Sequence, residues 1–128
     1  MVPEDATGSV PKKDLGDRAF AFATRVVKLC RTLEEQGSVS RTLARQLLRS
    51  GTSIGANIEE GQASQSRADF ISKYSIACKE ARETHYWLRL LVSSELVPDT
   101  RLNDLSDEAN QLIAILTTIV KKTKAGAP

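Results

Sequence analysis

Two glutamates and a histidine in the third quarter of the chain could support metal or acid–base chemistry. Glu80 and Glu83 are spaced to lie one helical turn apart on one face. Di-iron sites in helical bundles use a glutamate from each of two helices together with two Glu-x-x-His motifs. The single histidine, His85, lies two positions after Glu83 and therefore points to a different face. We predict no metal and no cofactor, and expect Glu80 and Glu83 to belong to a partly buried polar network between helices.

Nucleophilic catalysis requires a cysteine or serine within hydrogen-bond reach of a base. Cys78 and His85 are two helical turns apart, about 10 Å along the axis, which is too far for such a pair. Cys30 and Cys78 both fall on or beside apolar rows and form no Cys-x-x-Cys motif, so each is interpreted as a reduced thiol. The sequence therefore predicts no enzyme and no small-molecule substrate.

A run of small residues from Leu48 to Gly61 superficially suggests a phosphate-binding loop. A Walker motif needs a lysine after its last glycine and a preceding strand, and this run has neither. Glycines inside a helix cost roughly 1 kcal/mol each, which close contact between helices can offset. We expect close packing here, with Ser53 and Asn57 forming hydrogen bonds across the helix interface.

Basic residues gather on the first half of the chain. From residue 18 to residue 49 there are seven basic and two acidic residues, a local balance of +5. The candidate phosphate-binding residues are Arg18, Arg25, Lys28, Arg41, Arg45 and Arg49. Such a patch could bind nucleic-acid phosphates, or it could pair with acidic residues of its own chain or a neighbouring copy. No aromatic residue interleaves with the arginines of residues 41–49, which argues against base stacking on that stripe.

Apolar residues recur at alternating steps of four and three in four segments, which is the period of an amphipathic helix. The segments predict helices at about 14–36, 40–61, 66–94 and 100–123, between an N-terminal tail over 1–13, interpreted as disordered, and a C-terminal tail over 124–128. Helices of similar length with short connections pack antiparallel to their neighbours. The predicted fold is therefore all-α, an antiparallel up-and-down four-helix bundle.

Composition narrows the cellular setting. Eighteen basic and sixteen acidic residues leave a net charge of +2, so any basic surface must be local. No apolar run approaches the roughly 18–20 residues that cross a bilayer, and residues 1–13 lack a signal-peptide core. We expect a cytoplasmic protein with no membrane partner. Additional apolar residues beside the main rows, such as Phe20, Val27 and Ile76, favour a homo-oligomer.

The segment from residue 48 to residue 61, LRSGTSIGANIEEG, resembles the hallmark segment of the bacterial 23S rRNA intervening-sequence proteins. The stretch from Glu80 to Glu83, followed by Tyr-Trp-Leu at 86–88, is similar to the third helix of that family. The likeness runs from about residue 14 to residue 122. The chain departs from the pattern at the glycines 51 and 55 and at Glu59. The matching signature positions are Ser53, Asn57, Glu60 and Gly61.

That resemblance implies a four-helix bundle that assembles into a ring, with pentamers among relatives. A more distant similarity links the family to the accessory variability determinant of diversity-generating retroelements, a basic protein that partners a reverse transcriptase and nucleic acid. We therefore expect a non-enzymatic oligomeric accessory protein that binds structured RNA or a nucleoprotein partner through the basic face. The alternative is a protein-only oligomeric scaffold without nucleic-acid binding, in which the arginines pair across subunits.

Overall fold

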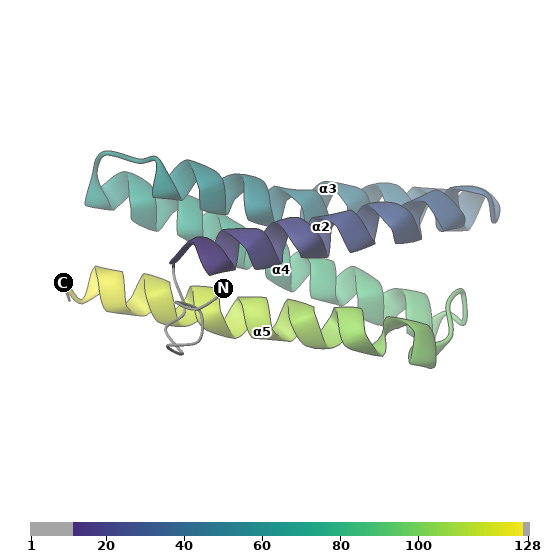
Figure 1. The fold of residues 1–128 in the computed structure, drawn as a ribbon. Helices are drawn as coiled ribbons and strands as arrows, with labels where there is room; N and C mark the ends of the chain where they lie inside the picture. Colours follow the sequence, from purple (N-terminus) through teal and green to yellow (C-terminus); the bar gives the residue numbers. More distant parts are fainter. Residues whose placement is uncertain (1–11, 127–128) are drawn as a thin grey trace, which may run out of the picture.

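The computed structural model describes residues 12–126, with side chains from Leu15 onward. It contains four α-helices, α2 (Lys12–Glu34), α3 (Ser38–Gln62), α4 (Arg67–Ser93) and α5 (Asp99–Lys124), and no strand within these residues. Consecutive helices run in opposite directions and lie side by side (Figure 1). The predicted antiparallel four-helix bundle is confirmed.

The helix boundaries lie within two residues of the predicted ones. The first helix begins at Lys12, inside the segment predicted as an N-terminal tail, and the last ends at Lys124. The remainder of the predicted tails, residues 1–11 and 127–128, lies outside the described residues.

Short turns set the antiparallel order. Gly37 has φ of 112°, a conformation that glycine adopts without a steric penalty, and it joins α2 to α3. Ser66 caps α4, because its side chain accepts a hydrogen bond of 3.0 Å from the backbone N–H of Asp69. Pro98, in extended conformation, precedes α5. Each turn stops one helix and starts the next within a few residues.

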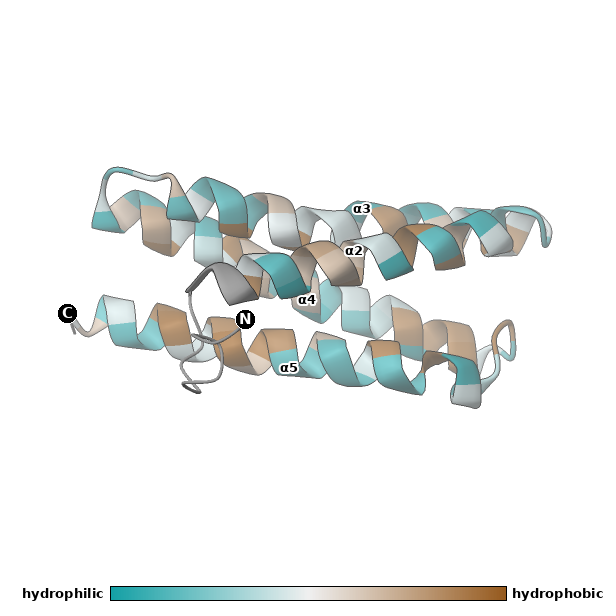
Figure 2. Cartoon of the chain, viewed as in Figure 1, coloured by the Kyte–Doolittle hydropathy of each residue, from teal (hydrophilic) through white to brown (hydrophobic). Residues whose placement is uncertain are grey.

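The predicted apolar rows form the core. Figure 2 shows hydrophobic and hydrophilic residues alternating along each helix, as one-sided rows require. The largest fully buried side chains include Phe22, Leu47, Ile54, Leu88 and Leu112. Within the described part of the chain, no helix is both long enough and apolar enough to span a membrane.

The four sides of the bundle are unequally packed. Contacts are extensive between α2 and α3, between α3 and α4, and between α4 and α5. The contact between α2 and α5, the first and last helices, is by far the smallest. One side of the bundle is therefore more open than the other three.

Candidate functional site

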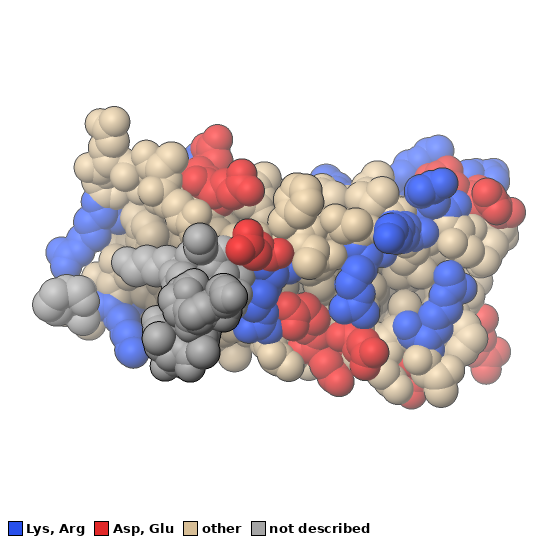
Figure 3. Space-filling view, in the orientation of Figure 1, with Lys and Arg blue, Asp and Glu red and all other residues tan. Residues whose placement is uncertain are grey.

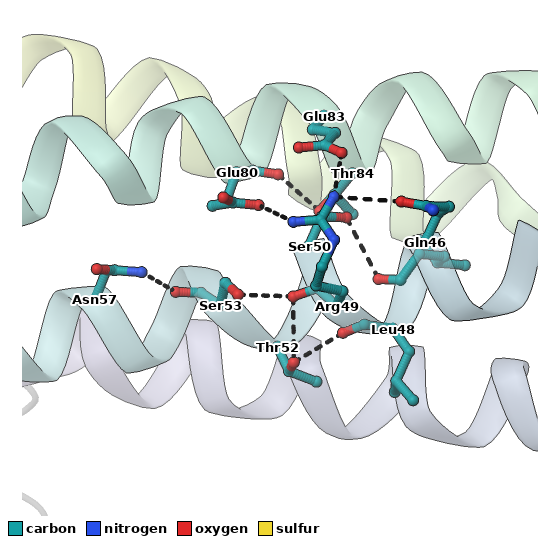
Figure 4. Close-up of polar contacts among 11 residues, drawn as sticks. Gln46, Leu48, Arg49, Ser50, Thr52, Ser53, Asn57, Glu80, Glu83 and Thr84 are labelled. Atoms are coloured by element: carbon teal, nitrogen blue, oxygen red, sulfur yellow. Dashed lines mark hydrogen bonds and ion pairs between the residues drawn. The ribbon is translucent and has the colours of Figure 1, made fainter.

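A polar network joins α3 to α4 at the middle of the bundle (Figure 4). The guanidinium of Arg49 donates to Oε1 of Glu80 at 3.4 Å and to a carboxylate oxygen of Glu83. Glu80 is only 9% exposed, so its charge needs such a partner. The expectation that Glu80 and Glu83 join an interhelical polar network thus matches their placement.

A second, fully buried contact accompanies this ion-pair cluster. The hydroxyl groups of Ser50 and Thr84 share a hydrogen bond of 2.8 Å across the α3–α4 interface. Both residues are completely buried, and each hydroxyl also has a backbone carbonyl of its own helix within hydrogen-bond distance, that of Leu47 at 3.4 Å for Ser50 and that of Glu80 at 2.8 Å for Thr84. Sequence reasoning missed this pair, although Ser50 and Thr84 lie on the same helix faces as the apolar rows.

The predicted interhelical hydrogen bonds of Ser53 and Asn57 are corrected by the structure. Oγ of Ser53 donates to the carbonyl of Arg49 at 2.7 Å, and Nδ2 of Asn57 donates to the carbonyl of Ser53 at 2.9 Å. Both bonds stay within α3, as Figure 4 shows. The backbone carbonyl of the preceding turn is the nearest acceptor for a short polar side chain on a helix, so the side chain bonds to it and not to an acceptor on the neighbouring helix.

Glycines bring α3 close to its neighbours, as predicted from the small-residue run. A Cβ at Gly61 would lie 2.6 Å from the ring of Tyr74, and one at Gly51 would lie 2.9 Å from Val26. Beside Gly61, the carboxylate of Glu60 pairs with the ammonium of Lys73 on α4 at 3.4 Å. The signature positions Glu60 and Gly61 therefore hold α3 against α4, and Gly51, which departs from the family pattern, brings α3 close to α2.

The six predicted phosphate-binding residues divide into two groups. Arg18 pairs with Glu108 on α5 at 2.8 Å, Arg49 belongs to the carboxylate network, and Arg45 makes a long contact of 3.7 Å with Glu34. Arg25 and Lys28 are exposed, and Arg41 is half-buried. Among the described residues, these last three form no ion pair.

Arg25 and Lys28 line a groove of about 310 Å³ on the open side, between α2 and α5. Arg101, from the first turn of α5, lies on the same groove, whose apolar part is formed by Leu29, Leu102 and Leu105. Figure 3 shows lysine and arginine gathered over the half of this face where α2 ends and α5 begins. Sequence reasoning missed Arg101, because no pattern along the chain links it to residues more than 70 positions earlier.

A different groove, of about 390 Å³, lies between α2 and α3 and is predominantly apolar. It is lined by Phe20, Ala23, Val27, Gly55 and Ala56, together with Thr24, Thr52 and Glu59. Phe20 is 68% exposed and Val27 39%. These are two of the additional apolar residues noted in the sequence, and in the single chain they remain accessible.

Two of the residues considered for chemistry, His85 and Cys30, have shifted pKa values. His85 is half-buried, and its pKa is lowered by burial and then by the positive charge of Arg89. Burial and the nearby Glu34 raise the pKa of the Cys30 thiol to about 11, so it is protonated at neutral pH. Within residues covered by the structure, no group of three or more histidine, cysteine or acidic side chains could hold a metal ion.

The chain matches known proteins along most of its folded length. Residues 12–118 match the family model described as "23S rRNA-intervening sequence protein". A solved structure from Bacteroides thetaiotaomicron, described as a protein of unknown function from the S23 ribosomal protein family, is 43% identical with a TM-score of 0.78. The similarity covers 84% of this chain and 98% of that chain. Among curated proteins, none matches the chain significantly. The extent of the family match and the likeness of the fold lead to one conclusion: the chain belongs to the family of 23S rRNA-intervening sequence proteins.

Proposed function

We propose that this chain is a non-enzymatic, cytoplasmic accessory protein that binds structured RNA through the groove between α2 and α5. The observation that carries the proposal is the convergence of Arg25, Lys28 and Arg101 around one groove. None of the three forms an ion pair with another described residue. Cations that lack internal partners are available to neutralise phosphates and release their counterions.

The shape of the groove supports a backbone contact rather than recognition of individual bases. Its cations come from two helices and surround leucine side chains, and no aromatic residue lines it. A phosphate held there would receive donors from two directions, beside apolar surface that lowers the local dielectric. Such a site favours the shape and charge of a folded RNA over its sequence.

The test is a charge-neutralised variant, R25Q/K28Q/R101Q, bound to a generic RNA hairpin over a series of salt concentrations. We expect weaker binding, and a salt dependence whose slope falls by roughly 2 to 3, since each phosphate contact contributes about 0.9. The matched control neutralises three exposed lysines near the other end of α5, K121Q/K122Q/K124Q. If this control loses as much slope as the groove variant, binding is diffuse and the groove is not the site.

The six phosphate-binding residues predicted from the sequence have different roles in the proposal. Arg25 and Lys28 line the proposed binding groove. Arg41 and Arg45 lie in the first turns of α3, at the end of the bundle where α2 ends. Arg18 and Arg49 serve interhelical ion pairs, so their substitution confounds folding with binding. A variant restricted to R41Q/R45Q therefore measures how far the RNA contact extends onto α3.

We further propose that the protein assembles into a homo-oligomer, a pentameric ring by its resemblance to relatives, through the apolar groove between α2 and α3. The specific support is the exposure of Phe20 and Val27 around that groove. The same surface also supports the alternative function, a protein-only scaffold that recruits a protein partner and ignores RNA. Assembly alone does not separate the two functions, whereas the hairpin titration does.

Self-assembly is tested by light-scattering mass for Phe20→Glu, with Val39→Glu as the control. Val39 is a comparably exposed apolar residue, 64% against 68%, that does not line the groove. We expect Phe20→Glu to reduce the mass to that of one chain and Val39→Glu to leave it unchanged. A wild-type protein with the mass of a single chain contradicts the assembly.

A further inference from the structure

The outward face of α4 carries a second basic surface that neither the sequence patterns nor the proposed function used. Lys79, Arg82, Tyr86 and Arg89 follow steps of three, four and three, so they form one stripe along the helix. All four residues are exposed. We call this set the α4 stripe.

The cations of the α4 stripe lack ion-pair partners in the part of the chain that the structure describes. Within the described residues, Lys79, Arg82 and Arg89 form no ion pair. The nearest acidic residues along α4, Glu80 and Glu83, have their carboxylates bound by Arg49 of α3. Like charges one turn apart repel each other, so a bound anion would stabilise this face.

Tyr86 places an aromatic ring between the cations. The ring is 49% exposed, whereas the other tyrosine, Tyr74, is 4% exposed and stacks on Phe70. The Tyr86 ring packs edge-to-face against Trp87, with centroids 5.1 Å apart, and the guanidinium of Arg89 lies 5.8 Å from its centroid. Because Trp87 and Arg89 contact the ring, it loses little freedom when a ligand stacks on its exposed part.

We propose that the α4 stripe binds a single-stranded RNA segment, with one unpaired base stacked on Tyr86 and the flanking phosphates on Lys79, Arg82 and Arg89. A row of cations with an interleaved aromatic ring is the combination that single-strand binding surfaces use. The stripe extends about 15 Å along the helix axis, enough for a few nucleotides. A duplex hides its base faces and could not use the ring, so the ligand is an unpaired strand.

The α4 stripe and the groove between α2 and α5 bind different parts of an RNA. The groove lacks an aromatic residue and contacts phosphates only, whereas the stripe also contacts an unpaired base. The two sites lie on different helices, and each can be removed without changing a residue of the other. A folded RNA with unpaired loops would offer a ligand to both.

The test compares two probes of equal charge, a 12-nucleotide oligouridine and the matching oligomer that lacks its bases. We expect wild-type protein to bind the oligouridine roughly tenfold more tightly than the abasic oligomer, which is the size of one stacking contact. Tyr86→Ala should abolish that difference and Tyr86→Phe should preserve it. Ile76→Ala, which truncates another exposed apolar residue of α4, is the control and should also preserve it.

The single tryptophan, Trp87, provides an independent signal because its ring contacts Tyr86. Its fluorescence should change with the oligouridine and remain constant with the abasic oligomer. R82Q/R89Q should weaken the binding of both probes. It should also lower the slope of the salt dependence by about 1.4, since each phosphate contact of a single strand contributes about 0.7. Equal binding of both probes by wild type, or an unaltered preference in Tyr86→Ala, would overturn the inference.

The outcomes also separate this inference from the proposed function. Binding of the hairpin through Arg25, Lys28 and Arg101, without any preference for the oligouridine over the abasic oligomer, refutes the α4 site alone. A Tyr86-dependent preference for the oligouridine, without hairpin binding, refutes the groove and supports the α4 site.

Discussion

The side of the bundle formed by α3 and α4 and the side formed by α2 and α5 use arginine in opposite ways. Between α3 and α4, Arg49 is bound by two carboxylates and the backbones approach closely at Gly61. Between α2 and α5, contacts are sparse, and Arg25 and Arg101 line an accessible groove without an ion pair to any described residue. We call these the closed side and the open side.

This difference shows that the position of a charge on its helix, rather than its residue type, decides what it does. A cation beside a buried carboxylate stabilises the fold, because leaving that carboxylate alone is costly. On the thinly packed side, Arg25 and Arg101 form no ion pair with a described residue, so they are available to a ligand. The following predictions test that contrast, from the largest expected effect to the smallest.

Gly61→Ala tests the close approach on the closed side. The new Cβ would lie 2.6 Å from the buried ring of Tyr74, so the overpacking should lower the free energy of unfolding by up to about 3 kcal/mol. Gly16→Ala is the matched control on α2, where the nearest atom would be 3.8 Å away. In the control, the free energy of unfolding should instead rise by up to about 1 kcal/mol, because alanine has a higher helix propensity than glycine. Urea unfolding of both variants measures the contrast, and a stabilised Gly61→Ala contradicts it.

The thiol of Cys30, which donates to the carbonyl of Ala44 at 3.3 Å, makes the α2–α3 interface sensitive to alkali. Its pKa is raised from 9.0 to about 11, so the folded state retains a proton that the unfolded state releases. The stabilisation is complete below pH 9 and is lost as the pH rises through 11, by up to about 2.7 kcal/mol in all. Unfolding of wild type and Cys30→Ala between pH 8 and pH 11 measures it, and parallel pH profiles would refute it.

Arg49→Gln and Arg25→Gln compare the two sides directly. Arg49→Gln should lower the free energy of unfolding by about 1 to 2 kcal/mol, because it removes the cationic partner of the buried Glu80. The effect stays below that of a fully buried pair, since half of the Arg49 side chain is exposed. Arg25→Gln should change stability by less than about 0.5 kcal/mol.

Hairpin binding should reverse that order, with Arg25→Gln weakened and Arg49→Gln close to wild type at temperatures where it stays folded. Denaturant unfolding and hairpin titration on the same protein samples provide both readings. Equal destabilisation by the two substitutions would remove the distinction between the closed and the open side.

Glu108→Gln tests the ion pair that does bridge the open side. The carboxylate accepts from Nε and Nη2 of Arg18 at 3.0 and 2.8 Å, but both side chains are more than one-fifth exposed. The expected loss is below about 1 kcal/mol and should shrink as salt is added. Asp107→Asn, the adjacent exposed carboxylate without an ion pair to a described residue, is the control and should have no effect. A larger, salt-independent loss would mean that the open side is packed as firmly as the closed one.

The sequence by itself determined the four helices, their antiparallel order and most of the core. The reason is that apolar spacing and turn residues act within a few positions along the chain, and the rows from Leu15 to Leu33 and from Leu102 to Leu116 are buried as their period requires. Close packing at Gly51 and Gly61 was predictable for the same reason, since a helix tolerates interior glycine where a neighbour approaches.

Only the tertiary structure decided which polar residues meet. It placed Ser50 against Thr84 and left Ser53 and Asn57 on their own helix, because hydrogen-bond partners depend on how two helices are rotated about their axes. It likewise paired Arg49 with α4, left Arg25 accessible and brought Arg101 to its side across the bundle. Charge interactions act through space and have no period along the sequence. The sequence therefore identified a basic segment, whereas the fold determined which of its cations lack an ion-pair partner among the described residues.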